Sequence, residues 1–237
     1  MYFWIIPLAI GIILLTVFLI FRVQEKRVIA VIIKGFTSLC FIITALVAWQ
    51  TSKIPNNGFG IFVLIALFFG LLGDVLLDIK YISKAHSLLF TRLGFIAFGV
   101  GHIFFTTGLF IQFYQHEMNP LYIIVPAVIA TILAVFTLLM EKFSPIKYDN
   151  MKPFVPTYGI LLFFTTCIYI SFTIFYGWQN ITLILMSVGF ILFALSDLIL
   201  NNTYFSSGFD KPIHIILNHA LYYVAQFLIA LSLFFLL

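Results

Sequence analysis

Long apolar runs separated by short polar stretches occupy almost the whole chain. Each run is about twenty residues long, which is the length of helix that crosses the hydrocarbon core of a bilayer. The pattern predicts an all-α membrane protein with about eight transmembrane helices in one bundle, forming a single integral membrane domain over residues 1–237. We expect these helices over residues 2–21, 28–49, 59–79, 93–113, 121–140, 154–176, 181–200 and 213–236.

The composition agrees with this pattern and excludes several classes of protein. Hydrophobic residues make up 63% of the chain and charged residues 8%, whereas a soluble domain carries about 25% charged residues. The net charge of +4 comes from short loops, so we expect no nucleic-acid partner. Cys40 and Cys167 lie inside apolar runs and are expected to be buried thiols. We expect a multi-pass protein of the bacterial inner membrane, or of an ER-type membrane if the source is eukaryotic.

The basic residues of the loops lie almost entirely on one side of the predicted bundle. The loops after the first, third, fifth and seventh helices hold ten of them: Arg22, Lys26, Arg27, Lys80, Lys84, Arg92, Lys142, Lys147, Lys152 and Lys211. The opposite loops hold only Lys53. Because basic loops stay in the cytoplasm, we predict that both termini are non-cytoplasmic.

Two acidic residues fall inside apolar runs, in similar surroundings. Asp74 follows Gly73 near the end of the third run, and Asp197 follows Ser196 near the end of the seventh. An acid at membrane depth is costly and therefore indicates a functional site. Both runs point the same way, and each is followed by a helix with an internal histidine. This pattern favours an arrangement of two parallel four-helix halves related by an axis along the membrane normal.

Further polar residues share the depth of these acids, near the predicted cytoplasmic ends of the helices. The last helix has one polar face, because its polar residues recur at helical spacing. We infer a polar cavity open to the cytoplasmic leaflet. The expected substrate-binding or supporting residues are Lys34, Asp78, His102, Tyr158, Asn218, His219, Tyr222 and Gln226.

Four segments together resemble the YhhN family, and the similarity extends over nearly the whole chain. They are residues 70–77, 94–98 with 101–102, 189–197 and 222–226. The animal members of that family are lysoplasmalogenases, eight-span enzymes that hydrolyse the vinyl ether of lysoplasmalogens. The resemblance implies a lysophospholipid substrate, a fatty aldehyde and a glycerophospho-alcohol as products, and essential aspartates at Asp74 and Asp197.

The chemistry of a vinyl ether suits a pair of carboxyl groups. Protonation of its β-carbon gives an oxocarbenium ion, water adds, and the hemiacetal collapses to aldehyde and alcohol. One carboxylic acid can supply the proton while a carboxylate stabilises the cation and activates water, as in glycoside hydrolysis. We hypothesise that Asp74 and Asp197 form this pair, and the sequence does not indicate which one is the acid.

Other interpretations remain open. The two aspartates could join helices by polar contacts, and Lys34 could neutralise an aspartate, bind a lipid phosphate or extend to the interface. Asp78 is expected to be interfacial and solvated. The histidines are expected to form hydrogen bonds rather than to catalyse. Alternative functions are a metal-dependent lipid hydrolase, with ligands from Asp74, Asp197, His102, His214 and His219, and a proton-coupled carrier. No motif requires a metal or another cofactor, and nothing in the sequence sets the oligomeric state.

Overall fold

The computed structural model describes residues 2–55, 57–206 and 211–236. Within these ranges there are eight helices long and apolar enough to cross a membrane, so the prediction of an all-α, multi-span protein is confirmed. They are α1 (Ile5–Val23), α2 (Arg27–Gln50), α3 (Gly58–Ile79), α4 (Ser87–Phe113), α5 (Leu121–Phe143), α6 (Phe154–Phe175), α7 (Ile181–Phe205) and α8 (Pro212–Ser232). The described residues contain no sheet, only one isolated antiparallel bridge between Ile146 and Ser206. Cys40 and Cys167 are free, as expected.

Two helices extend well beyond their predicted ends. Helix α4 begins at Ser87 rather than at residue 93, and α7 continues to Phe205 rather than ending at residue 200. Hydropathy reports where the apolar run ends, whereas the helix itself continues as long as its backbone hydrogen bonds do. In the last turns of α7, Asn202 and Thr203 also bond their side chains to the carbonyls of Leu198 and Ile199, both at 2.9 Å.

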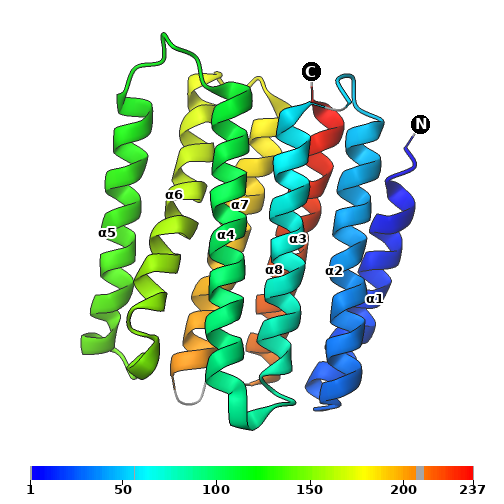
Figure 1. Cartoon of the computed structure of the whole chain (residues 1–237), viewed down its shortest axis with the longest axis vertical. Helices are drawn as coiled ribbons and strands as arrows, with labels where there is room; N and C mark the ends of the chain where they lie inside the picture. The colour runs from blue at the N-terminus through cyan, green and yellow to red at the C-terminus, as the bar shows by residue number, and fades with distance from the viewer. Residues whose placement is uncertain (1, 56, 207–210, 237) are drawn as a thin grey trace.

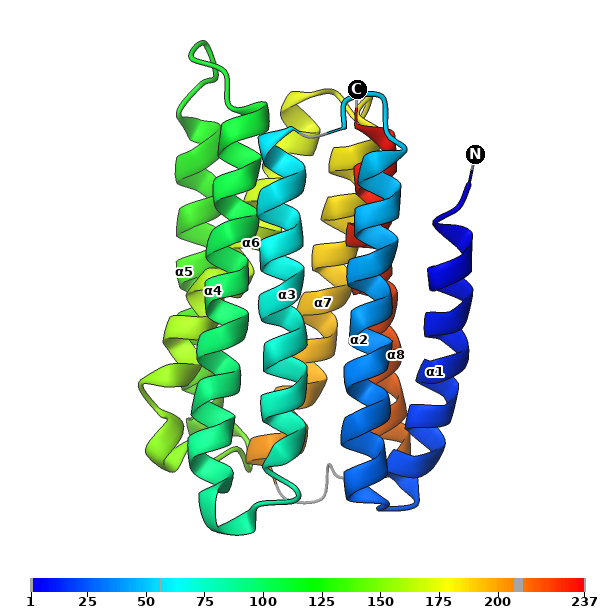
Figure 2. The same cartoon turned by 45° about the vertical axis from the view of Figure 1, so that its right-hand side comes forward.

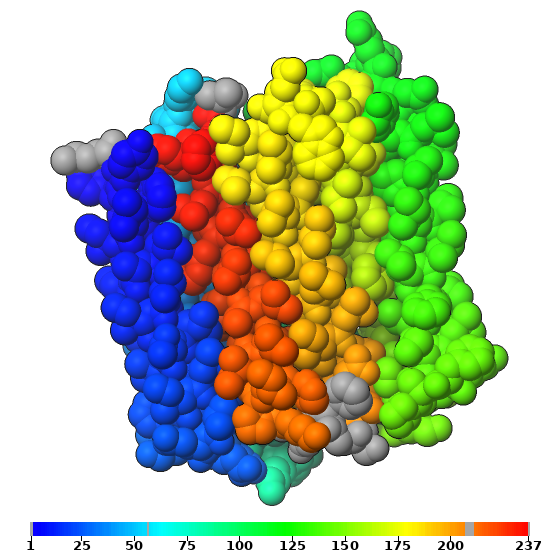
Figure 3. Space-filling model, turned by 180° about the vertical axis from the view of Figure 1, so that it is seen from behind, coloured from blue at the N-terminus to red at the C-terminus, as the bar shows by residue number. Residues whose placement is uncertain are grey.

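Six of the eight helices form a closed ring. Along this ring α2 contacts α3, α3 contacts α4, α4 contacts α6, α6 contacts α7, α7 contacts α8, and α8 returns to α2. Helices α1 and α5 pack outside the ring, on opposite sides of the bundle (Figures 1 and 2). Only 11% and 17% of the residues in their apolar stretches are buried, against 44% or more in the other helices. Figure 3 shows α7 and α8 covering the rear face between these outer helices.

The contacts along the ring, and those that join α1 to α2 and α5 to α6, repeat when the first four helices are exchanged with the last four. Helix α2 contacts α1, α3 and α8, while α6 contacts α5, α7 and α4. Helices α3 and α7 also begin alike, because Asn57 and Asn180 cap them by accepting hydrogen bonds from Gly60 N and Leu183 N at 2.9 and 3.1 Å. These are the contacts that two parallel halves require, and their relation by an axis stays a prediction.

Glycines bring the helices that carry the two acids close to their neighbours. A Cβ added to Gly101 of α4 would lie 3.1 Å from the carbonyl oxygen of Ala66 on α3. One added to Gly189 of α7 would lie 3.2 Å from the carbonyl oxygen of Ala225 on α8. Small residues allow such close backbone approach between helices in membranes. The pairs α3–α4 and α7–α8 are thereby held tightly on opposite sides of the ring.

Candidate functional site

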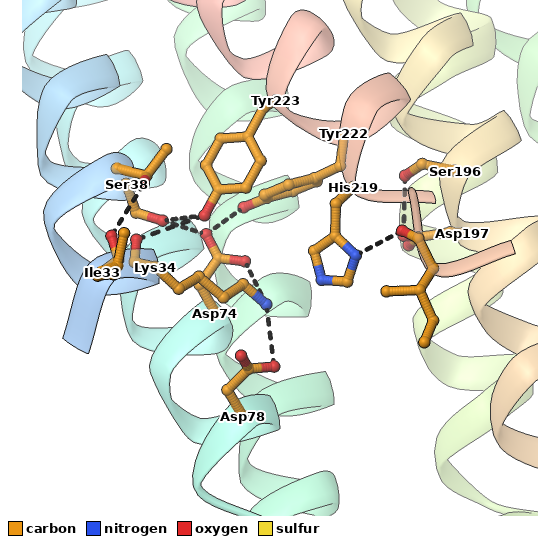
Figure 4. Close-up of polar contacts among 12 residues, drawn as sticks. Ile33, Lys34, Ser38, Asp74, Asp78, Ser196, Asp197, His219, Tyr222 and Tyr223 are labelled. Atoms are coloured by element: carbon orange, nitrogen blue, oxygen red, sulfur yellow. Dashed lines mark hydrogen bonds and ion pairs between the residues drawn. The ribbon is translucent and has the colours of Figure 1, made fainter. Parts of the chain in front are cut away.

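The polar side chains of the ring gather on its inner side, near the end where α3 and α7 finish and α2 and α8 begin. Figure 4 shows Asp74 and Asp78 on α3, Lys34 and Ser38 on α2, and the two tyrosines of α8 converging on Asp74. Asp197 comes from α7, with His219 between it and the Asp74 group. The two acids predicted from sequence therefore face the same interior.

Asp74 is 2% exposed and is surrounded by donors from two other helices. Its Oδ2 accepts hydrogen bonds from Ser38 Oγ at 2.6 Å and from the Tyr222 hydroxyl at 2.8 Å. Its Oδ1 lies 3.4 Å from Lys34 Nζ. The Ser38 hydroxyl also lies 2.9 Å from the Tyr223 hydroxyl, which extends the network along α8. A buried carboxylate is tolerated only with partners of this kind.

Lys34 lies between two carboxylates and does not reach the membrane interface. Its Nζ is 3.4 Å from Asp74 Oδ1 and 3.4 Å from Asp78 Oδ1, and the lysine side chain is only 6% exposed. Of the three roles that the sequence left open, the structure supports neutralisation of the aspartates. A lysine in this position has no ammonium directed toward a lipid phosphate.

The expectation that Asp78 is solvated is wrong. Asp78 is 2% exposed, and its Oδ2 is buried without a hydrogen-bond partner among the described residues. It follows Asp74 by four residues, so the two carboxylates lie on the same face of α3 one turn apart. That face packs on α2, where Lys34 can contact both. The burial of Asp78 therefore depends on its contact with the neighbouring helix α2 and not on the depth of the residue in the membrane.

Asp197 has a different environment. Its Oδ2 accepts a hydrogen bond from the Tyr158 hydroxyl of α6, and its Oδ1 is 3.4 Å from Ser196 Oγ. In the described part of the chain no basic side chain forms an ion pair with it. Asn218 Nδ2 donates to the Ser196 carbonyl at 2.7 Å and so ties α8 to this turn of α7.

A small cavity, the chamber, separates the two acids. Its volume is about 30 Å³, and its lining includes Asp74, Asp197, Lys34, His219 and Tyr222. A cavity needs roughly 10–15 Å³ and a few polar partners to hold one water molecule. The chamber therefore has the size and polarity to hold water between two carboxyl groups contributed by opposite sides of the ring.

A comparison with protein families identifies the chain. The YhhN family model matches residues 29–233, which include the helices of the ring except the first two residues of α2. The chain belongs to the YhhN family. No match was found for it among curated proteins or among solved structures.

The remaining predicted residues of this YhhN protein divide into two groups. Tyr158, Asn218, His219 and Tyr222 line or support the cavities beside the acids, and His219 Nδ1 lies 2.8 Å from the Ile215 carbonyl oxygen. Gln226 is 1% exposed but does not line the chamber.

The metal ligands considered for the metal-dependent alternative do not form a site among the described residues. No group of three or more His, Cys, Asp or Glu side chains in these ranges could hold a metal ion.

His102 is the exception among the polar residues, because it lies in an aromatic environment. It is 1% exposed, and neither ring nitrogen has a hydrogen-bond partner in the described part of the chain. Its ring centroid is 5.1 Å from that of Phe193 and 5.8 Å from that of Tyr158. A buried polar group without a partner lowers stability, so its presence in the YhhN protein needs a reason other than folding.

Replacing His102 with leucine should therefore stabilise the protein. The expected gain is about 1–3 kcal/mol, the usual cost of an unsatisfied buried polar group. The measurement is the apparent unfolding temperature in detergent, with His116→Leu in an exposed loop as the control. A lower unfolding temperature for His102→Leu would show that the imidazole contributes to packing.

Three residues of the site in this YhhN protein are not among the predicted site residues. Ser38 follows Lys34 by four residues, and helical spacing places both on the same face of α2. Tyr223 neighbours the expected Tyr222, but only the contact between α2 and α8 brings it to Ser38. Tyr204 lines the chamber and lies beyond the predicted end of the seventh helix, where the apolar signal had already ended.

Proposed function

We propose that this protein is a membrane-embedded hydrolase that cleaves the vinyl ether of lysoplasmalogens, such as lysoplasmenyl-ethanolamine or -choline. The products would be a fatty aldehyde and a glycerophospho-alcohol. One observation carries the proposal: Asp74 and Asp197 line the same chamber, whose size suits a water molecule. Membership of the YhhN family, which includes lysoplasmalogenases, supports the substrate class.

The two acids would share the steps of the reaction. A protonated carboxyl transfers its proton to the β-carbon of the vinyl ether, and the adjacent carbon becomes an oxocarbenium ion. The second carboxylate stabilises this cation and takes a proton from the attacking water. In the breakdown of the hemiacetal, its hydroxyl gives a proton to the first carboxylate, and the second carboxyl protonates the departing glycerol oxygen. The aldehyde and the alcohol are released, and both acids return to their starting protonation states. Paired carboxyl groups perform analogous steps in glycoside hydrolysis.

The surroundings of Asp74 and Asp197 indicate which of them donates the proton and which stabilises the cation. Asp74 receives two hydroxyl donors and lies beside Lys34, an arrangement that favours a negative charge. Asp197 has Tyr158 and Ser196 as partners and no ion pair among the described residues. We therefore assign proton donation to Asp197, and cation stabilisation and activation of water to Asp74.

The alkenyl tail would leave the chamber on the Tyr158 side. Asp197 also borders an apolar cavity of about 40 Å³, lined in part by Phe95, Leu162 and Leu198. Tyr158 and Phe95 in turn line a groove of about 290 Å³ between α4 and α6, whose other residues are almost all apolar. A tail in this groove would stay in contact with the bilayer while its first carbons reach Asp197.

The function is tested with purified protein and three lysolipids that share a headgroup. We expect aldehyde release from the 1-alkenyl lipid only, and none from the 1-alkyl lipid, whose ether lacks the double bond. Release of fatty acid from the 1-acyl lipid without any aldehyde would identify an esterase instead. Loss of activity with a chelator would favour the metal-dependent alternative. Proton flux into sealed vesicles without hydrolysis would favour the carrier.

The orientation is tested separately. We propose that both termini are non-cytoplasmic, because ten loop cations lie on one side and one on the other. Both ends of the chain lie at the same end of the bundle, as this topology requires (Figure 1). Cysteines placed at the exposed Lys53 and Lys147 should react with an impermeant reagent from opposite sides of the membrane. Reaction of both positions from the same side would contradict the three crossings between them, and reaction of the Lys147 position from the non-cytoplasmic side would contradict the orientation.

A further inference from the structure

A polar vestibule lies at the end of the ring next to the chamber. Its volume is about 400 Å³, and its lining residues come from the ends of α1, α3 and α7 and from the starts of α2 and α8. The residues that line it are Arg22, Glu25, Arg27, Lys80, Tyr81, Thr203, Tyr204 and Ile215. It therefore holds three basic side chains and one acidic side chain, a net charge of +2.

Two of these cations form no ion pair with an acidic residue in the described ranges. Arg27 pairs with Glu25 at 3.5 Å. Arg22 and Lys80 form no ion pair with any described carboxylate, although the Asp78 carboxylate lies deeper on α3. Instead, both lie over aromatic rings: the Arg22 guanidinium carbon is 3.6 Å from the Tyr81 ring centroid, and Lys80 Nζ is 2.8 Å from the Tyr204 ring centroid. Among the described residues, Arg22 and Lys80 are therefore positioned cations without an ion-pair partner.

The vestibule continues toward the two acids. A narrow cavity of about 20 Å³, lined by Arg22, Asp78, Tyr204 and His219 among others, lies between it and the chamber. Tyr204 lines the vestibule, this narrow cavity and the chamber. The cations and the acids therefore line a series of neighbouring cavities with Tyr204 as a shared wall.

The spacing along this series matches a lysophospholipid. Lys80 follows Asp74 by six residues at the end of α3, which corresponds to a helical rise of about 9 Å. In an extended lysoplasmalogen the bonds from phosphorus through glycerol to the vinyl-ether carbon span roughly 8 Å. A vinyl ether in the chamber would therefore place its phosphate at the level of Lys80.

We propose that Arg22 and Lys80 bind the phosphodiester of the substrate headgroup, an inference that rests on the proposed function and extends it. The proposal assigns to the vestibule the phosphate contact that Lys34 cannot make, since that lysine is held by two aspartates. Pairing of Asp78 with Lys34 reduces the repulsion that its carboxylate would exert on a bound phosphate. Arginine and lysine with free donors are the usual ligands of phosphate groups.

The charge of Lys80 is consistent with such a ligand. Burial lowers the pKa of the Lys80 ammonium well below its usual value, and the Asp78 carboxylate opposes this shift. A phosphate beside the ammonium would add a second opposing charge and favour the protonated form. The phosphate and the protonated form of Lys80 would thus stabilise each other.

The test measures binding by calorimetry, so that it does not depend on turnover. The ligands are a 1-alkyl lysophosphatidylethanolamine, which the proposed reaction does not cleave, and the matched 1-alkylglycerol without phosphate. We expect the wild-type protein to bind the phospholipid about tenfold more tightly. Lys80→Met should remove this preference, Lys80→Arg should retain it, and Lys84→Met should retain it because Lys84 is exposed outside the vestibule.

Three outcomes would overturn the proposal. They are equal binding of both ligands by the wild type, an unchanged preference in Lys80→Met, and inorganic phosphate binding as tightly as the lysolipid. The last would identify a site for free phosphate. Arg22→Gln provides a second variant if Lys80→Met does not fold. Failure of the proposed function would instead appear as an absence of aldehyde release from the 1-alkenyl lipid, whatever the binding result.

Discussion

Asp74→Asn and Asp197→Asn should each abolish aldehyde release while leaving the protein folded. Asparagine keeps the size of aspartate and can still accept the hydrogen bonds of Ser38, Tyr222 or Tyr158. It can neither donate the carboxyl proton nor carry the negative charge. Removal of a general acid or base typically costs at least about 10²-fold in rate. The measurement is turnover of the 1-alkenyl lysolipid by purified variants that elute as monodisperse protein.

The matched control is Asp149→Asn, which makes the same change in an exposed loop. This variant should retain wild-type turnover, because Asp149 contacts none of the cavities. Near-normal turnover in either Asp74→Asn or Asp197→Asn would show that this residue is a contact between helices and not a catalytic group.

Lys34→Met should cause a large loss of stability. The change leaves the carboxylates of Asp74 and Asp78 buried without their shared cation. Removal of one partner from a buried ion pair costs about 3–5 kcal/mol. The measurement is the apparent unfolding temperature in detergent, together with the yield of folded protein.

The double variant Lys34→Met/Asp78→Asn separates charge from packing. It removes one of the two unpaired carboxylates, so much of the lost stability should return. If Lys34→Met unfolds like the wild type and only raises the KM for phosphate-bearing lipid, then the lysine contacts the headgroup. That result would contradict both the ion-pair network and the vestibule proposal.

The spans and the two acids could be predicted from sequence because the bilayer imposes a simple rule on each. A helix must supply about twenty apolar residues to cross it, and this length recurs along the chain. An ionisable residue inside such a run is conspicuous, so Asp74 and Asp197 were apparent without any knowledge of packing. Tyr158, His219 and Tyr222 followed from their shared depth.

The partners of these residues could not be predicted, because they depend on which helices become neighbours. The burial of Asp78 follows from the contact between α2 and α3, which places Lys34 beside it. The separation of His102 from the polar group follows from its position against Phe193 on another helix. Tyr204 lies past the apolar run, where hydropathy carries no information about the helix.

The proton transfer to carbon is tested most directly by hydrolysis in D₂O. Purified protein is incubated with the 1-alkenyl lysolipid, the aldehyde is reduced at once to the alcohol, and its deuterium content is read by mass spectrometry. The preformed aldehyde, incubated under the same conditions, corrects for exchange after release. Proton donation by a carboxyl of the chamber predicts one deuterium at C2, the former β-carbon of the vinyl ether, and turnover that is lost in Asp197→Asn. Aldehyde without deuterium at C2 would contradict the mechanism.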